Sequence, residues 1–527
     1  PRQACRAAAC RAAPARARMA VKPGIVAARL DSVQSRLRHS QLATHLAGLF
    51  DAADPGALAE IEAAARALEE ALVRLGAALP ARTAPAIPFA RLRGRLRAPV
   101  SAPVARRFGR VVDAEFRTAT FRKGIDFAAP AGAYPLDGWE HTGVSRLEAF
   151  DLAHEVLLQR GTIRPGAMKR MDEVRLGLVD YPDFEVPAPD GAFSAEIRSL
   201  LGGNAGAYGI AVLDITDPAR PFYAEVNGGT AQNPGSVGKI VVALAAFQAL
   251  ADVHPWDVEA RSHALRDSVI PPSNALIVPH DHVVPFWKRG APSIRRREIV
   301  EGDEGNLWTW LDWMLSASSN AGGSTVMGQI AAIKHFGAAY PPSQAQLNGF
   351  VLGAPPGTMA ALVHDALLDG LRENGIDPSE LRQGSAFTRS GRARIPGTIG
   401  STSTARALVE FLARMEQGKL VDPWSSLEIK RLLYLTDIRI RYAAEPTLDT
   451  AAVYFKSGSL YACGGSGPCG KYFGNSKNYM NSIATVEYDG GSGKQLRYIV
   501  ALLSNVLGQN SIETHQALAR RIHHVIA

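Results

Sequence analysis

The chain has 527 residues, 46% of them hydrophobic, and a formal net charge of +8. This length allows two or more domains with a sizeable buried core, and no apolar run reaches the roughly 18 residues that favour a membrane-spanning helix. The charge is uneven, because residues 1–134 hold 22 Lys and Arg against 10 Asp and Glu. Those Arg residues alternate with Ala, Pro and Leu rather than with aromatic residues, which favours a solvated basic segment over nucleic-acid binding.

Residues 1–80 are predicted to form a helical extension. Leu58, Ile61, Ala65 and Leu68 recur at intervals of three and four residues, which is the spacing of a coiled-coil seam. We expect two helices here, in an arrangement such as a coiled-coil hairpin.

Residues 81–133 combine a Pro- and Arg-rich linker with a short motif. Arg122-Lys-Gly-Ile-Asp126 resembles the opening of a LytM-type zinc peptidase domain, whose His-x-Gly-x-Asp motif supplies two zinc ligands. Arg122 stands at the His position and cannot bind zinc, because an Arg side chain stays protonated. The resemblance covers residues 104–132 and implies a degenerate remnant without zinc chemistry.

Residues 134–190 are predicted to be a helical connecting segment, with apolar helical positions over 145–180. A folded domain is expected from 191 to 527. Its predicted helices and strands, beside those that carry the motifs below, are a helix at 192–201, strands at 208–215, 221–226, 482–488 and 496–503, and a helix at 511–526.

A serine and a lysine three residues apart open a strongly apolar predicted helix. In Asn233-Pro-Gly-Ser-Val-Gly-Lys239, Ser236 and Lys239 would share one helix face near its N-terminus. A serine hydroxyl is a poor nucleophile until a base removes its proton. The pattern therefore predicts Ser236 as a nucleophile and Lys239 as its base, although a lone Ser-x-x-Lys occurs easily by chance.

A second motif, Ser318-Ser-Asn320, follows the predicted apolar helix 307–315. The Ser318 hydroxyl can relay a proton to a leaving group. The Asn320 amide can hold both Lys239 and a substrate amide. A helix cap followed by a turn is the alternative interpretation.

A third motif, Lys456-Ser457-Gly458-Ser459, ends a β-rich run. Lys456 can attract a substrate carboxylate, and a glycine at position 458 lets an extended substrate approach the strand closely. An ordinary strand end with a Ser/Gly turn is the alternative.

In this order, the three motifs resemble the signature of the penicillin-binding-protein/serine β-lactamase superfamily. The resemblance covers roughly residues 190–527. It implies an α+β fold, with an antiparallel sheet flanked by helices and an all-helical domain. It also implies an acyl-enzyme formed on Ser236, an oxyanion hole made by the backbone N–H groups of Ser236 and Ser459, and no cofactor or metal.

The same resemblance implies a small-molecule or peptide substrate such as peptidoglycan or a β-lactam. A periplasmic or extracellular location is expected, although no signal peptide is visible in this chain. Neither nucleic acid nor an integral membrane segment is expected among its partners.

Three activities stay open: a D,D-peptidase-like amidase or esterase, an atypical class A-like β-lactamase, and a non-catalytic penicillin-binding or cell-wall sensor module. Class A enzymes activate the deacylating water with a loop Glu, which would fall near Phe387 or Thr388. Residues 381–400 contain no Asp or Glu, and Glu380 lacks the family context. This departure disfavours an efficient β-lactamase.

Two smaller patterns complete the sequence. Cys463 and Cys469 flank a Gly-rich stretch, which suits a small disulfide-closed loop or two free thiols. His280 and His282 could bind a metal, but the lack of a third ligand nearby favours an ordinary loop within an insertion at 265–305.

Overall fold

The computed structural model describes residues 138–154, 169–278, 282–489 and 495–527, together with four short strands between residues 104 and 127. The chain divides into two units, Pro1–Arg97 and Ala98–Ala527. The helical extension predicted for residues 1–80 lies outside the described residues.

The described strands of the second unit form one five-stranded sheet and several two-stranded pairs. The large sheet is antiparallel throughout, in the order β11-β12-β13-β5-β6, so that β11 is an edge strand. The strands are β1 (Val104–Arg106), β2 (Gly109–Val112), β3 (Ala119–Arg122), β4 (Asp126–Phe127), β5 (Tyr208–Asp214), β6 (Phe222–Val226), β7 (Val284–Phe286), β8 (Arg295–Arg297), β9 (Leu381–Arg382), β10 (Thr402–Ser403), β11 (Ala452–Ala462), β12 (Lys477–Asp489) and β13 (Gln495–Asn505).

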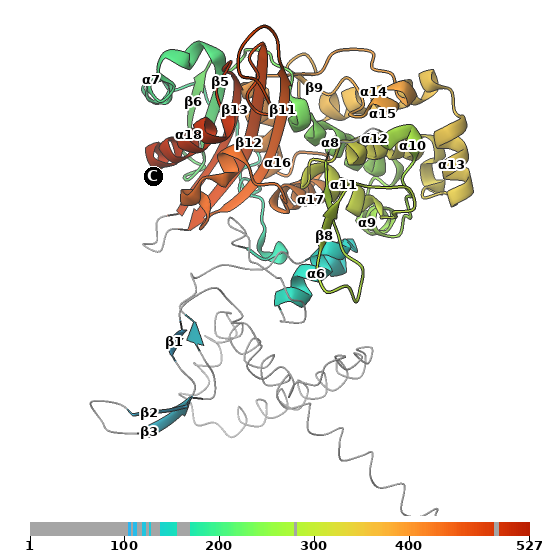
Figure 1. The fold of residues 1–527 in the computed structure, drawn as a ribbon, viewed down its shortest axis with the longest axis horizontal. Helices are drawn as coiled ribbons and strands as arrows, with labels where there is room; N and C mark the ends of the chain where they lie inside the picture. The colour runs from blue at the N-terminus through green and yellow to red at the C-terminus, as the bar shows by residue number, and fades with distance from the viewer. Residues whose placement is uncertain are drawn as a thin grey trace, which may run out of the picture. The chain divides into compact units, whose positions relative to one another are not determined.

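Helices cover the sheet and form a helical layer beside it (Figure 1). The α-helices are α5 (Trp139–Thr142), α6 (Ser145–His154), α7 (Gly191–Ser199), α8 (Lys239–Val253), α9 (Val258–Arg266), α10 (Asn274–Ile277), α11 (Leu307–Leu315), α12 (Asn320–Phe336), α13 (Gln344–Gly353), α14 (Pro356–Glu373), α15 (Arg389–Arg394), α16 (Ala405–Glu416), α17 (Pro423–Tyr434) and α18 (Ser511–Ile526). The 3₁₀ turns are η2 (Met171–Glu173), η3 (Gly202–Ala207), η4 (Gly235–Gly238), η5 (Gly337–Ala339), η6 (Arg441–Ala444) and η7 (Pro446–Leu448).

The sheet is buried on both faces, which follows from the alternation of its side chains. On β13, Val500 and Leu502 join a core with α7 and α18, whereas Ile499 and Ala501 join a larger core with the other helices. The predicted α+β class, an antiparallel sheet flanked by helices with a helical part beside it, is confirmed.

Helix α8 passes through the larger core and orients the site. From Lys239 to Leu250 almost every residue is buried. The stretch Gly235–Val253 is long and apolar enough to span a membrane by composition, but 78% of its most apolar window is buried inside the protein. It is therefore the central core helix of this unit.

The described part of the connecting segment has helix at Trp139–Thr142 and Ser145–His154 and the 3₁₀ turn η2 at Met171–Glu173. Residues 134–137 and 155–168 of this segment lie outside the described residues. The chain from 174 to 190 runs without helix, and Val174 and Leu178 anchor it in the larger core.

Candidate active site

The predicted nucleophile and base lie at the start of α8. Ser236 sits in the 3₁₀ turn η4, and Lys239 begins the helix one turn later. The Lys239 Nζ lies 2.9 Å from the Ser236 Oγ. Lys239 is fully buried, whereas Ser236 is half-buried and lines a cavity of about 580 Å³. The spacing of three residues thus brings hydroxyl and amine into hydrogen-bonding contact.

The second motif supplies two more oxygens around the Lys239 amine. Lys239 Nζ donates to the backbone carbonyl of Ser318 and to the Asn320 Oδ1, each at 2.8 Å. Both of these oxygens can only accept. A neutral lysine with two N–H groups can satisfy them and still direct its lone pair at the Ser236 hydroxyl.

Ser318 connects this group to the third motif. Lys456 Nζ donates to the Ser318 Oγ at 2.8 Å and to the Ser457 carbonyl at 2.8 Å. Ser318 adopts a φ of 59°, a left-handed conformation that costs a non-glycine residue on the order of 1–3 kcal/mol. Such strain often marks a functional site. Here the strained residue contacts both lysines: its carbonyl accepts from Lys239 and its hydroxyl accepts from Lys456.

Close packing between β11 and η4 sets the positions of two backbone amides. A Cβ added at Gly458 would lie 2.1 Å from the Pro234 carbonyl oxygen and 3.0 Å from the Ser236 nitrogen. A Cβ added at Gly235, whose φ is 54°, would lie 2.8 Å from the Ser459 nitrogen. The two glycines therefore allow the amides of Ser236 and Ser459 to border the same cavity.

Arg441, in η6, is a buried cation that the sequence motifs did not reveal. Its guanidinium donates to the Gly458 carbonyl at 3.1 Å and to the Ser459 Oγ at 3.3 Å. Among the ion pairs of the described residues, none involves Arg441 or Lys456. Lys456 and Arg441 do not line the cavity themselves, but they contact the lining residues Ser318 and Ser459. Two buried cations without a carboxylate partner make this side of the cavity a favourable place for an anion.

Burial changes how these cations titrate. The pKa of Lys456 lies well below its ordinary value, because burial removes water from the ammonium and because Lys239 and Arg441 repel it. Burial likewise lowers the pKa of Arg441 to about 10. Lys456 can therefore lose its proton more easily than an exposed lysine.

The opposite wall of the cavity has no acidic side chain. Gln383, Ser385 and Phe387 line it, and no Asp or Glu is found among the described lining residues. The Phe387 ring centroid lies 4.7 Å from the Lys239 Nζ. Glu380, the nearest carboxylate in sequence, accepts a hydrogen bond from Thr404 and does not line the cavity.

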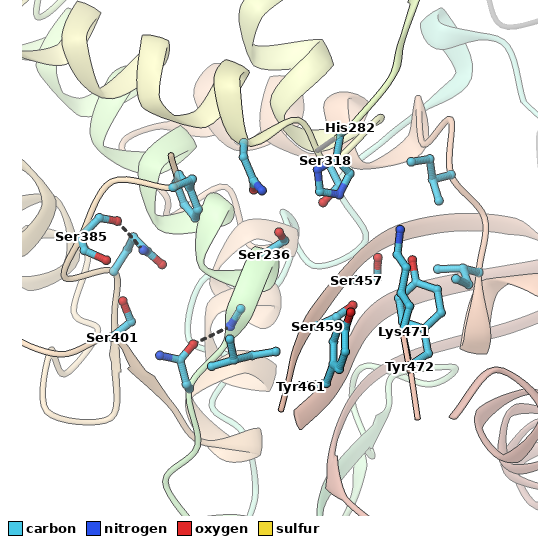
Figure 2. A pocket seen from close by; sticks show the side chains of 18 of the residues that line it. Ser236, His282, Ser318, Ser385, Ser401, Ser457, Ser459, Tyr461, Lys471 and Tyr472 are labelled. Carbon is cyan, nitrogen blue, oxygen red and sulfur yellow. Dashed lines mark hydrogen bonds between the residues drawn. The ribbon is translucent and has the colours of Figure 1, made fainter. Parts of the chain in front are cut away.

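Figure 2 shows how the labelled side chains surround Ser236. Ser385 and Ser401 lie to one side of it, and Ser318, Ser457 and Ser459 to the other. His282 also lines the cavity, although the sequence favoured an ordinary loop there; His280 lies outside the described residues. The described residues contain no group of three or more His, Cys, Asp or Glu side chains that could hold a metal ion.

The comparisons with known proteins concern the fold. No family model matches the chain, and no curated protein matches it. Solved structures similar to it include a β-lactamase from Sphaerobacter thermophilus, with 14% identity over 63% of this chain and 96% of that chain and a TM-score of 0.40. PBP-A has 14% identity over 65% and 98%, with a TM-score of 0.41. A class A β-lactamase from Mycobacterium abscessus has 17% identity over 63% and 98%, with a TM-score of 0.40. At these sequence identities and TM-scores, the similarity supports no conclusion about the activity of this chain.

Proposed function

We propose that the chain is a serine hydrolase of the penicillin-binding-protein/serine β-lactamase type, which forms an acyl-enzyme on Ser236. The observation that carries this proposal is the hydrogen-bonded series Ser236–Lys239–Asn320 and Ser318–Lys456 beside one cavity. Nucleophile, base and proton relay are the groups that acyl transfer requires.

The proposed acylation begins when neutral Lys239 takes the proton of the Ser236 hydroxyl. The Ser236 Oγ then bonds to the substrate carbonyl carbon, and the N–H groups of Ser236 and Ser459 stabilise the oxyanion. As the bond to the leaving group breaks, Ser318 donates its proton to that group. Lys456 gives a proton to the Ser318 oxygen. The proton that Lys239 took from Ser236 then passes to Lys456, so that both lysines return to their starting states.

The two buried cations behind the cavity wall favour a substrate that carries a carboxylate on its leaving group. Lys456 and Arg441 are buried next to Ser457–Ser459, where an extended substrate would lie along the open edge of β11. We therefore favour amide and ester substrates of the D,D-peptidase kind.

The lack of an acidic side chain in the described wall favours slow deacylation of bulky acyl groups, because a water that attacks the ester needs a base. This observation favours a penicillin-binding hydrolase over an efficient β-lactamase. A periplasmic or extracellular location remains part of the proposal.

The test is turnover of small esters and D-alanyl peptides by the wild type and by Ser236→Ala. The substitution should lower turnover by several orders of magnitude. Ser199→Ala, which removes an exposed hydroxyl that donates to the Glu196 carbonyl, is the matched control and should leave turnover unchanged. Undiminished hydrolysis by Ser236→Ala would refute the proposal.

A further inference from the structure

The loop between β11 and β12, residues 463–476, forms an outer wall of the cavity. A disulfide bond between Cys463 and Cys469 closes its first part, which settles the two alternatives that the sequence left open. Lys471 and Tyr472, just past the disulfide, line the cavity. In Figure 2 they lie beyond Ser457 and Ser459, at the end of the cavity away from Ser385 and Ser401.

Tyr472 is held firmly in this wall. Its backbone carbonyl accepts hydrogen bonds of 3.3 Å from both the N–H and the hydroxyl of Ser511, at the start of α18. Its φ of 67° is left-handed, and its ring lies 5.5 Å from the Arg441 guanidinium carbon. The Lys471 Nζ lies 5.3 Å from the same ring centroid, a contact that restrains the ammonium at the rim.

Lys471 lines the cavity, unlike the two buried cations Lys456 and Arg441. Lys471 is exposed, whereas Lys456 and Arg441 are buried. The apolar side chains of Ile438 and Ile440 line the cavity as well. Because no Asp or Glu of the described residues lines the cavity, an anion at the rim would meet no acidic side chain there.

We propose that Lys471 and Tyr472 form a second anionic subsite on the leaving-group side, so that the preferred leaving group carries two carboxylates. This inference rests on the proposed acyl-enzyme function. Ser318, the proposed proton donor to the leaving group, marks the leaving-group side of the cavity. In Figure 2, Lys471 lies on the same side of Ser236 as Ser318. One carboxylate lies at Ser457 and Ser459, in the field of the buried Lys456 and Arg441, and the other lies at Lys471.

The test compares two esters with the same acetylglycyl acyl group, one with D-lactate and one with D-malate as the leaving group. The two leaving groups differ by one carboxylate. The wild type should have the higher kcat/KM for the malate ester. Lys471→Ala should lower the malate-to-lactate ratio about fivefold, the upper range for an exposed ion pair, and 1 M salt should lower it in the wild type.

Lys477→Ala is the matched control. Lys477 lies on the same hairpin with its Nζ 5.6 Å from a tyrosine ring, that of Tyr479, but does not line the cavity. It should leave the ratio unchanged.

Two results would overturn the inference while leaving the proposed function intact: equal kcat/KM for the two esters in the wild type, or the same ratio in Lys471→Ala and Lys477→Ala. If neither ester acylates Ser236, the proposed function fails, and the subsite fails with it.

Discussion

Replacing Gly458 by alanine tests whether the contact between β11 and η4 builds the oxyanion hole. The new methyl carbon would lie 2.1 Å from the Pro234 carbonyl oxygen and 2.8 Å from the Val237 nitrogen. Ordinary contacts begin at 3.4 Å, so β11 must retreat from the turn by about 1.3 Å, the difference between these contact distances. Both neighbours are backbone atoms, so no side-chain rotation can relieve the clash.

A retreat of this size should separate the Ser236 and Ser459 amides. Loss of one oxyanion donor costs about 10²–10³ in rate, and a misplacement near 1 Å costs about 10²-fold. We therefore expect Gly458→Ala to lower the rate constant for acylation by a fluorescent penicillin by about 10²–10³. Overpacking should lower the free energy of unfolding by about 1–3 kcal/mol.

The assay is stopped-flow acylation, with urea unfolding measured in parallel. Gly349→Ala is the control, because a Cβ added at this helical position meets no atom within 4 Å. Folded Gly458→Ala protein that acylates within threefold of the wild-type rate would refute the reasoning about the oxyanion hole.

Three further predictions concern charged groups. Because the pKa of Lys456 is lowered from 10.5, its positive charge is present below that lowered pKa and is lost as the pH rises through it. The kcat/KM of a D-lactate ester, divided by that of a neutral ethyl ester, should therefore fall over this pH range. A constant ratio up to pH 10.5 would contradict the role of Lys456 in carboxylate binding. Lys430 is fully buried and donates to Glu416 and Glu487, each at 2.7 Å; Lys430→Met should lower the free energy of unfolding by about 3–5 kcal/mol, measured by urea unfolding, and a loss below 1 kcal/mol would show that these buried charges need no partner. Phe387→Glu places a carboxylate where a ring now faces Lys239. Loss of the penicilloyl adduct, monitored by intact-mass spectrometry, should become faster by about tenfold or more, because the carboxylate adds a general base. An unchanged adduct lifetime would show that a missing base does not limit deacylation.

The sequence predicted the parts of the site that lie within short motifs. Ser236 and Lys239 are three residues apart, so that helical geometry alone brings them together. Ser318 and Lys456 lie 138 residues apart in sequence, and only the order of the three motifs suggested that they meet. The order of motifs and the strands on either side of them were enough to predict the antiparallel sheet and its helices.

The sequence did not reveal residues whose role depends on tertiary packing. Arg441 follows an ordinary Ile-Arg-Ile sequence, and nothing local signals that it is buried beneath Gly458 and Ser459. From the sequence alone, Phe387 is an aromatic residue in a loop, and only the fold places its ring next to the Lys239 amine. The sequence predicted helical positions as far as residue 180, but residues 174–180 have no helix, and Val174 and Leu178 pack into the core from irregular chain. Burial favours apolar residues in either conformation.

The most direct test of the central claim is peptide mapping of the protein after incubation with penicillin G. The account predicts one penicilloyl group, attached to the peptide that contains Ser236, persisting for minutes while small esters continue to turn over on protein without the adduct. It also predicts no adduct on Ser236→Ala. An adduct on another residue, or rapid penicillin hydrolysis without a detectable adduct on Ser236, would contradict the account.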